Sequence, residues 1–583
     1  MPRAHRTQET QVGTDLAELA RAWLAEDPDP RTRDELSALL TAATGSPPDA
    51  RAEAELADRF AGTLQFGTAG LRGELGAGPN RMNRVVVIRA AAGLAAYLRQ
   101  RAEPAGEPGL VVVGYDARHR SAEFARDTVA VMVGAGLRAA LLPRPLPTPV
   151  LAFAVLHLGA AAGVMVTASH NPPQDNGYKV YLGDGMQIVP PADAQISAAI
   201  EAVGPLAGVP LAESGWETLD DAVVEAYLDR ATDVVHGGSS RDVSVVYTPM
   251  HGVGGEVLTS AFTRAGFPAP AVVAEQATPD PDFPTVAFPN PEEPGAMDLA
   301  FALAESAEPD IVIANDPDAD RCAVAVPVPP GAHDEGGGRK WRMLRGDEVG
   351  ALLAVHLVSK HVEGTFATSI VSSSLLARIA TAAGLGYAET LTGFKWIART
   401  PELAFGYEEA LGYCVDPGGV RDKDGITAAL LVAELAAALK HQGRTLTDLL
   451  DDIAVEYGLH ATDQLSVRVA DLTTISKAMT RLRESPPTEL AGLRVTAADD
   501  LRAGAFGLPP TDGLRYRLTR EGEGPAVSSA RVVVRPSGTE PKLKCYLEVV
   551  IPVTAANVLA PCRVLATSVL DALKEDLATA AGI

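Results

Sequence analysis

The alternation of apolar and polar residues divides the chain into helical and strand-like stretches. Residues 14–60 repeat apolar positions at helical spacing, with a break at "SPPDA", and are predicted to form amphipathic helices. Residues 110–142 read as an apolar run, a polar turn, a helical stretch and a second apolar run. This succession predicts a strand, a helix and a second strand, which is the βαβ unit of α/β domains.

The same succession returns twice further along the chain, in pattern rather than in letters. It covers residues 242–267 and residues 366–386. We therefore expect three α/β domains in tandem. After about residue 460 the chain changes to strand-like runs, among them "ARVVVRPSGTEPKLKCYLEVVI", followed by a last helix. That segment predicts a smaller C-terminal α+β domain with a mostly antiparallel sheet.

Length supports a division into several domains. A chain of 583 residues exceeds the size at which one hydrophobic core usually stops growing. Segments rich in Pro and Gly, at 204–210 and 327–338, are predicted to be a linker and a surface excursion. The predicted domains are residues 1–235, 236–342, 343–460 and 461–583.

Composition and charge narrow the classes of function. Of the residues, 47% are hydrophobic and 21% charged, as in ordinary globular proteins. The 50 Lys and Arg stand against 74 Asp and Glu, and the net charge of −24 repels nucleic acids and acidic membranes. We therefore expect neither as a partner, and an anionic ligand would need a locally basic pocket.

Cysteine usage and the N-terminal sequence bear on location. The four cysteines form no CxxC pair, so neither a disulfide framework nor a zinc ribbon is predicted. The N-terminus carries no apolar signal-peptide core, and no run reaches eighteen uninterrupted apolar residues. We expect a cytoplasmic protein without a membrane span.

Three acidic residues follow the apolar run "IVIA". Asp316, Asp318 and Asp320 alternate along a loop, which can direct three carboxylates to one point, and hard oxygen ligands suit Mg²⁺. An EF-hand loop would need Gly and Glu where Arg321 and Pro327 stand. A solvated acidic turn is the other interpretation, but three close negative charges repel one another without a cation. The pattern favours a metal site.

A second polar cluster lies between two strand-like runs near the C-terminus. A Ser-Gly-Thr turn offers backbone N–H groups and hydroxyls to an anion, and an arginine matches phosphate with two donors. Turn chemistry alone explains Pro and Gly but not the basic residues and hydroxyls in so acidic a protein. Phosphate binding is predicted for Arg535, Ser537, Gly538, Thr539 and Lys544.

Ser169 and His170 follow the apolar run "GVMVTA", at the carboxyl end of a predicted strand. Adjacent Ser and His are no evidence of a catalytic triad, and by itself Ser169 suits a turn or a helix cap. Together with the acidic loop and the phosphate loop, however, a serine at a strand end describes phosphoryl transfer through a phosphoserine.

"TASHNP", "DPDADR" and "RPSGTEPK" resemble the signature loops of the α-D-phosphohexomutase superfamily. Further blocks are similar and follow in the same order: "FGTAGLRG", "GYDARHRS", "TGFKWI", "FGYEEALGY" and "DKDGI". Together they cover residues 66–546, and the nearest branch is that of the phosphoglucomutases and phosphopentomutases. The resemblance implies four domains around a central cleft, which carry in turn the phosphoserine, metal, sugar and phosphate loops.

The resemblance also implies a role for each residue. Ser169 would carry a phosphoryl group, with Mg²⁺ held by Asp316, Asp318, Asp320 and an oxygen of that phosphoserine. Lys179 and His170 would handle protons, while Arg72 and Arg321 would add positive charge. The sugar would be held by Arg321, Thr392, Lys395, Glu408 and Lys423, and its other phosphate by the cluster around Arg535 in a mobile last domain. A sugar bisphosphate would act as activator.

One departure from the family pattern concerns the sugar loop. Many hexose enzymes have Glu-x-Ser there, whereas Glu408 is followed by Glu409 and Ala410. The leading prediction is transfer of a phosphoryl group between positions 1 and 6 of glucose or mannose phosphate. A phosphopentomutase, a sugar-bisphosphate synthase and a non-catalytic phosphosugar-binding protein remain alternatives, and the chain could be a monomer or a homodimer. The absence of a G-x-x-x-x-G-K-[ST] motif disfavours a P-loop kinase.

Overall fold

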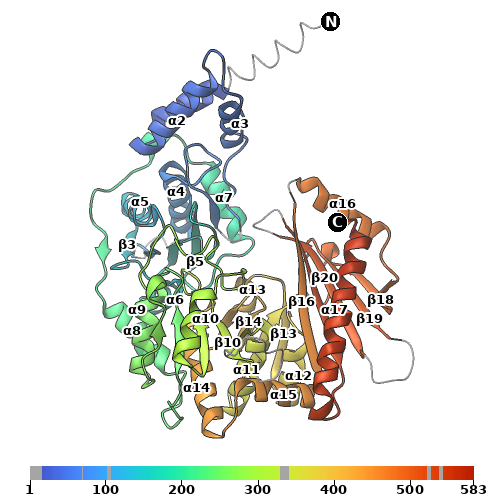
Figure 1. Cartoon of the computed structure of the whole chain (residues 1–583). Coiled ribbons are helices and arrows are strands. Elements are labelled where there is room, and N and C mark those ends of the chain that lie inside the picture. Colours follow the sequence, from blue (N-terminus) through green and yellow to red (C-terminus); the bar gives the residue numbers. More distant parts are fainter. Residues whose placement is uncertain are drawn as a thin grey trace, which may run out of the picture.

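A computed structural model describes the chain in seven stretches and shows three α/β units followed by a C-terminal domain built on an antiparallel sheet (Figure 1). This arrangement confirms the predicted fold class. The described residues are 16–67, 70–101, 107–328, 340–469, 471–520, 527–537 and 542–583.

Helices precede the first sheet, as the amphipathic pattern predicted. Residues 16–26 are helical, and α2 and α3 span Pro30–Ala43 and Ala50–Arg59. Asp29 and Asp49 cap the two helices by accepting backbone N–H groups of their first turns. Figure 1 shows α2 and α3 at the end of the molecule opposite the second and third sheets.

The first sheet is mixed, with strand order β1-β5-β4-β2-β3-β6. The predicted βαβ unit is present, because β2, α5 and β3 follow one another and β2 pairs in parallel with β3. β4 pairs in parallel with β2 and antiparallel with β5. Residues 167–174, the turn between β4 and β5, therefore lie at one edge of the sheet. The elements are β1 Leu71–Glu74, α4 Arg84–Arg101, β2 Leu110–Tyr115, α5 Ser121–Gly134, β3 Arg138–Leu141, α6 Thr148–His157, β4 Ala162–Val166, β5 Asp175–Leu182, α7 Ala192–Glu201, η1 Leu206–Gly208, β6 Glu217–Thr218 and α8 Ala222–Thr232.

The second sheet has the order β11-β10-β9-β7-β8. β7 and β9 are parallel, so the loops after them leave the same edge. The predicted linker at 204–210 contains η1, whereas residues 329–338 of the predicted excursion lie outside the described residues. The elements are β7 Val245–Thr248, α9 Gly254–Arg264, β8 Ala271–Val272, η2 Ala274–Gln276, α10 Asp298–Ala307, β9 Ile311–Ala314, β10 Ala323–Pro327 and β11 Trp341–Met343.

The third sheet has the order β13-β12-β14-β15, with β12 parallel to both neighbours. It is covered by long apolar helices, among which α14 is buried along most of its length. The elements are α11 Gly346–Ser359, β12 Thr365–Ser369, α12 Leu375–Ala382, β13 Gly386–Thr390, α13 Phe394–Ile397, β14 Leu403–Glu408, β15 Gly412–Cys414, α14 Gly425–His441 and α15 Leu446–Tyr457.

The C-terminal sheet is antiparallel throughout, in the order β16-β21-β20-β19-β18-β17. Helices α16 and α17 pack together on it, as the red and orange part of Figure 1 shows. The elements are β16 Leu459–Arg468, α16 Leu472–Glu484, β17 Glu489–Leu490, β18 Leu493–Asp500, η3 Leu501–Ala503, β19 Leu514–Thr519, β20 Ser529–Pro536, β21 Lys542–Ile551, η4 Ala556–Val558 and α17 Leu559–Ala581.

One helical stretch, residues 556–581, is long and apolar enough to cross a membrane by length and composition alone. In the structure it packs on β16 and β21 and buries one apolar stripe there, which includes Leu570, Leu573 and Leu577. The contact with the sheet therefore accounts for this buried stripe, as in an amphipathic helix of a globular domain, whereas Val564 of the same helix stays exposed.

The apolar cores follow a different division from the sheets. One continuous core runs from helix α6 of the first domain through the second and third sheets to α15. A second core lies under α4 and α5, and the C-terminal domain has its own. The first three domains are thus joined through buried apolar contact.

Candidate active site

Ser169 stands in the turn after β4 with its backbone in the left-handed region, at φ 53°. This conformation is uncommon for a residue with a side chain and is held here by neighbours. The backbone N–H of Ser169 donates to Thr167 Oγ1 at 2.9 Å, and Arg118 donates to the Ser169 carbonyl at 2.7 Å. The turn directs the Ser169 hydroxyl onto Asp316 of the second domain, to which it donates at 2.7 Å.

Asp316, Asp318 and Asp320 occupy the loop after β9, and all three are buried. One oxygen of each lies within 4.8 Å of the others. Asp318 Oδ1 and Asp320 Oδ1 accept no hydrogen bond from the described part of the chain. A buried acceptor without a partner is unfavourable, and a cluster of three buried carboxylates matches the oxygen donors of a hard divalent cation. The residues therefore fit a metal site.

Two lysines compensate part of this negative charge. Lys179 donates to Asp318 Oδ2 at 2.7 Å and to Asp320 Oδ2 at 2.9 Å, while Lys423 Nζ lies 3.3 Å from Asp320 Oδ2. Burial alone lowers the pKa of Lys179, but the charges of the two aspartates raise it above its ordinary value. Lys179 therefore stays a charged ammonium group.

The carboxylates respond in opposite directions. Burial and the charges of its two neighbours raise the pKa of Asp316 well above its usual range. Burial also acts to raise the pKa of Asp320, but Lys179, Lys423 and Arg321 outweigh it and lower that pKa far below the usual value. The cationic neighbours therefore favour the charged form of Asp320, whereas the surroundings of Asp316, beside the serine hydroxyl, disfavour a negative charge there.

His170 and Arg72 complete the surroundings of the serine. His170 Nδ1 lies 3.1 Å from Ser169 Oγ. Burial, followed by the charges of Arg321 and Arg72, lowers the pKa of His170 well below 6.5, so the imidazole is neutral. Arg72 donates to Asn171 Oδ1 at 3.0 Å, on the same turn.

The predicted sugar-binding residues come from three loops of the third domain. Glu408, at the end of β14, accepts the backbone N–H of Gly393 at 2.7 Å, which places Thr392 in the adjoining turn. Lys423 lies over the ring of Phe394, 5.7 Å from its centre. Burial lowers the pKa of Lys395 to about 8, although the charge of Glu408 opposes this.

Arg321 connects these loops to the metal loop. Its backbone N–H donates to Asp316 Oδ1 at 3.1 Å. Burial by itself lowers the pKa of Arg321, but the charges of Asp316, Asp320, Glu292 and Glu408 raise it. Its guanidinium group thus lies among acidic residues of the second and third domains.

The predicted phosphate-binding residues lie at the end of the β20–β21 hairpin. Arg535 and Lys544 are paired in its register, and the Ser537 N–H donates to the Lys542 carbonyl at 2.8 Å. Gly538 and Thr539 lie outside the described residues. The Lys544 charge acts on Glu292 and the Arg535 charge on Lys395, so this hairpin end faces loops of the second and third domains.

Several residues at the site escaped the sequence analysis. Glu292 lies 3.7 Å from Arg321, and Thr148 donates to Asp318 at 2.6 Å. Tyr181 and Tyr227 donate to Asp422 and Asp424, at 2.7 and 2.9 Å, and so hold the loop that carries Lys423. The "DKDGI" block signals that loop, but no local pattern signals tyrosines more than a hundred residues away.

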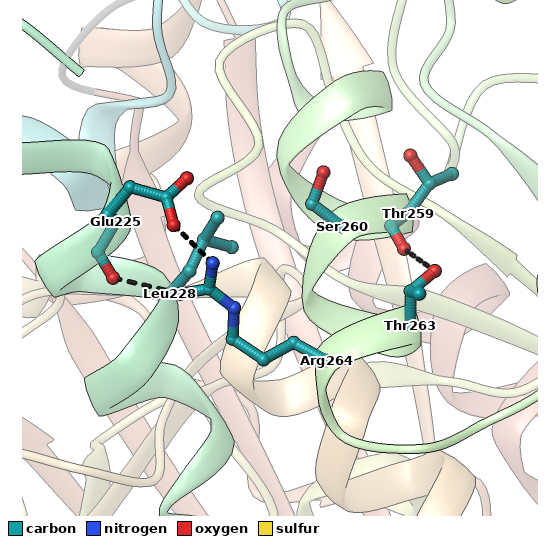
Figure 2. A pocket seen from close by; sticks show the side chains of 6 residues that line it. All are labelled: Glu225, Leu228, Thr259, Ser260, Thr263 and Arg264. Atoms are coloured by element: carbon teal, nitrogen blue, oxygen red, sulfur yellow. Dashed lines mark hydrogen bonds and ion pairs between the residues drawn. The ribbon is translucent and has the colours of Figure 1, made fainter. Parts of the chain in front are cut away.

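A separate cavity of about 420 Å³ lies between helices α8 and α9. Figure 2 shows Arg264 at its centre, directed at Glu225. Asp229 also accepts from Arg264, at 2.7 Å, so the arginine is already paired. The lining residues are Glu225, Leu228, Thr259, Ser260, Thr263 and Arg264, and no predicted site residue is among them.

The chain combines three α/β units with an antiparallel domain, and in its site a serine hydroxyl contacts a buried cluster of three carboxylates. This combination defines a phosphosugar-mutase type of enzyme. The chain belongs to the phosphoglucomutase/phosphomannomutase family. Its domains I, II and III match residues 63–205, 225–329 and 345–457, and its C-terminal domain matches residues 479–560. This confirms the superfamily that the sequence motifs indicated.

The relatives carry different names. A probable phosphomannomutase of Haemophilus influenzae is 48% identical, over 80% of this chain and 93% of its own length. The phosphopentomutase of Homo sapiens is 36% identical (85% and 87%), and a phosphoglucomutase of Staphylococcus epidermidis is 36% identical (83% and 90%). A solved structure from Thermus thermophilus, provisionally assigned as a phosphomannomutase, is 27% identical and covers 88% of this chain and 99% of its own, with a TM-score of 0.65.

Proposed function

We propose that this enzyme moves a phosphoryl group between positions 1 and 6 of a hexose phosphate, glucose or mannose, by way of a phosphoserine at Ser169. The hydrogen bond of 2.7 Å from Ser169 Oγ to Asp316 carries this proposal. It unites a hydroxyl that can bear the phosphoryl group with carboxylates that can hold a counter-charge. The transfer needs both together, because negative charge spreads over the phosphoryl oxygens in the transition state.

Mg²⁺ would be held by Asp316, Asp318, Asp320 and an oxygen of the phosphorylated Ser169. When bound, it would supply positive charge that offsets the charge of the travelling phosphoryl group. The two partnerless carboxylate oxygens, on Asp318 and Asp320, support this assignment. Lys179, which remains charged, would add a second positive centre next to the same carboxylates.

In the first transfer, a sugar hydroxyl oxygen bonds to phosphorus and the bond from phosphorus to Ser169 Oγ breaks. The hydroxyl proton ends on Oγ, so atoms and charge balance. In the return transfer, Ser169 Oγ bonds to the phosphorus of the other phosphate of the bisphosphorylated sugar, the bond from that phosphorus to the sugar oxygen breaks, and the Ser169 hydroxyl proton ends on the sugar oxygen. His170, which is neutral and has Nδ1 at 3.1 Å from Oγ, would accept a hydrogen bond from the hydroxyl and orient it for the attack.

Between the transfers the bisphosphorylated sugar has to reverse its orientation. Thr392, Lys395, Glu408 and Lys423 would hold its hydroxyls, and Arg72 and Arg321 the transferring end. Arg535, Ser537, Gly538, Thr539 and Lys544 would grip the other phosphate, release it and bind again. A sugar bisphosphate would then also serve as activator, because it can phosphorylate an unmodified Ser169.

A pentose phosphate is the second candidate substrate, with transfer between positions 1 and 5. Ala410 favours it, because the third position of the sugar loop offers no hydroxyl to a sugar. The names of several relatives point the same way. A sugar-bisphosphate synthase would use the same residues but release the intermediate. We expect a cytoplasmic enzyme, as a monomer or homodimer.

Exchange assays with Mg²⁺ and a trace of the matching sugar bisphosphate test this function. Glucose 1-phosphate, mannose 1-phosphate and ribose 1-phosphate are compared as substrates. We expect isomerised hexose phosphate, and an intact mass with one added phosphate that Ser169→Ala lacks. Faster conversion of ribose 1-phosphate would select the pentose function, and accumulation of bisphosphate would indicate a synthase. No product from any of them with the phosphorylated enzyme would refute a mutase.

A further inference from the structure

Two adjacent glutamates, Glu408 as the last residue of β14 and Glu409 directly after it, contact different neighbours. Glu408 accepts from the turn that holds Thr392, on the side of the predicted sugar site. Glu409 instead accepts the hydroxyl protons of Ser372 at 3.0 Å and Ser369 at 3.2 Å. Its own N–H donates back to Ser372 Oγ at 3.2 Å. Glu409 is thus tied to residues 369–374, which we call the SIVSSS loop.

The SIVSSS loop connects β12 to α12 and rests on the C-terminal domain. Ser373 Oγ and the Ser374 N–H both donate to Glu548 Oε1, at 2.6 and 2.8 Å. The Ser372 carbonyl accepts from Arg531. Every serine from 372 to 374 therefore contacts the C-terminal domain, while the same loop holds Glu409 from the other side.

Apolar packing reinforces this joint. Ile370 and Val371 of the SIVSSS loop form a buried cluster with Leu501, Val533 and Tyr546 of the C-terminal domain. Burial raises the pKa of the Tyr546 phenol, the charge of Glu409 raises it further, and Arg535 opposes the rise. Tyr546 is thus near both Glu409 and the arginine assigned to the phosphate.

The β20–β21 hairpin carries these contacts to its end. Its register pairs Arg531 with Glu548 and Arg535 with Lys544, so the residues that touch the SIVSSS loop and those of the phosphate grip share one ladder. Four residues of strand span about 13 Å. An antiparallel ladder is stiff over that distance, so the position of the SIVSSS loop sets the position of Arg535.

We propose that Glu409 is a positioning residue that fixes the phosphate grip of Arg535 relative to the sugar contact of Glu408, through the SIVSSS loop. Burial raises the pKa of Glu409 to about 7, and the charge of Glu408 adds to the rise. The hydrogen bonds from Ser372 Oγ at 3.0 Å and Ser369 Oγ at 3.2 Å hold this carboxyl in place. The expected effect of Glu409 on phosphosugar kinetics rests on the proposed function, whereas its expected effect on the position of the C-terminal domain does not.

Spin labels test the geometric part without any assay of activity. With Cys562 replaced by Ser, labels are attached at Arg378→Cys on α12 and Lys477→Cys on α16, both exposed in the structure. We expect a narrow distance distribution in the full chain, and a broader or shifted one in Glu409→Ala. Glu363→Ala, an exposed glutamate of the same domain, should leave it unchanged. The same distribution in Glu409→Ala and the parent would overturn the proposal.

Kinetics test whether Glu409 acts through Arg535. We expect Glu409→Ala to raise the KM for the phosphosugar about tenfold with a much smaller change in kcat, as loss of uniform phosphate binding does. Added to Arg535→Ala, it should change KM no further. Effects that multiply in the double variant would show independent action and contradict the proposal. Glu409→Gln and Ser372→Ala serve if the alanine variant does not fold, as judged by circular dichroism. If the parent chain shows no exchange, the proposed function fails, and the spin-label distances alone test the positioning role of Glu409.

Discussion

The joints among the first three domains differ in kind from the joint to the last one. The former share a continuous apolar core, in which buried tyrosines cross from one domain to hydrogen-bond another. The latter consists of serines, ion pairs such as Arg531 with Glu389, and two small apolar clusters. Polar interfaces of this kind allow domains to move relative to one another.

The difference matches what each joint positions. The serine, the three aspartates and Lys423 come from three domains and must keep distances near 3 Å, which only a shared rigid core can hold. In the proposed mechanism, the phosphate grip has to open when the intermediate reorients. A joint of replaceable hydrogen bonds suits that task, and the following predictions test the contrast.

The largest effect is expected at the centre of the rigid region. Ser169→Ala should lower exchange by at least about 10⁴-fold, because no other hydroxyl replaces the one that bears the phosphoryl group. The melting temperature should stay within a few degrees of the parent. Steady-state exchange and calorimetry measure both, with Ser306→Ala on the surface as control. Undiminished exchange in Ser169→Ala would exclude the covalent route.

Asp318→Asn should lower exchange about 10³-fold, since it removes a charge from the cation site and from Lys179. Titration calorimetry should show Mg²⁺ bound at least about tenfold more weakly. Asp282→Asn, which alters an exposed partner of His119, provides the control and should bind Mg²⁺ as the parent does. Equal Mg²⁺ affinity in Asp318→Asn would place the cation elsewhere.

Glu548→Ala should loosen the last domain. Burial acts to raise the pKa of Glu548, but Arg531 and the hydrogen bond from His460 lower it to about 2. Because this lies below the ordinary 4.5, the stabilisation is present above pH 4.5 and is lost as pH falls towards 2. The variant should lose about 3 kcal/mol and melt in two calorimetric transitions at pH 7.

The exposed pair of Arg563 with Asp451 crosses the same joint and supplies the control. Arg563→Ala should cost less than about 1 kcal/mol and keep a single transition. Equal effects of the two variants would mean that the buried network contributes no more than a surface ion pair.

The smallest effect concerns Lys395, between the two regions. Its pKa of about 8 means that the ammonium group loses its charge as pH rises past 8. The KM for a phosphosugar should therefore increase by up to about tenfold from pH 7 to pH 9. Lys395→Arg keeps its charge and should show a flat profile in the same assay. A rise of equal size in that variant would assign the effect to another group.

Much of this molecule was open to prediction from the sequence. Strand-turn-helix patterns indicated the three α/β units and the antiparallel last domain, because period and turn residues act locally. The loops at 169 and 316–320 were recognisable for the same reason, as short runs of unusual polar residues after apolar strands. The sequence also pointed to Glu408 and Lys423 through family blocks.

Only the tertiary structure decided which of these residues meet and in which state. That Lys179 is charged and His170 neutral depends on burial and on carboxylates far away in the chain. The tyrosine contacts to Asp422 and Asp424, and the attachment of Glu409 to the SIVSSS loop, are likewise long-range. Local periodicity determines secondary structure, whereas pKa values and contacts between domains depend on the summed field and packing of distant segments, which no window of sequence contains.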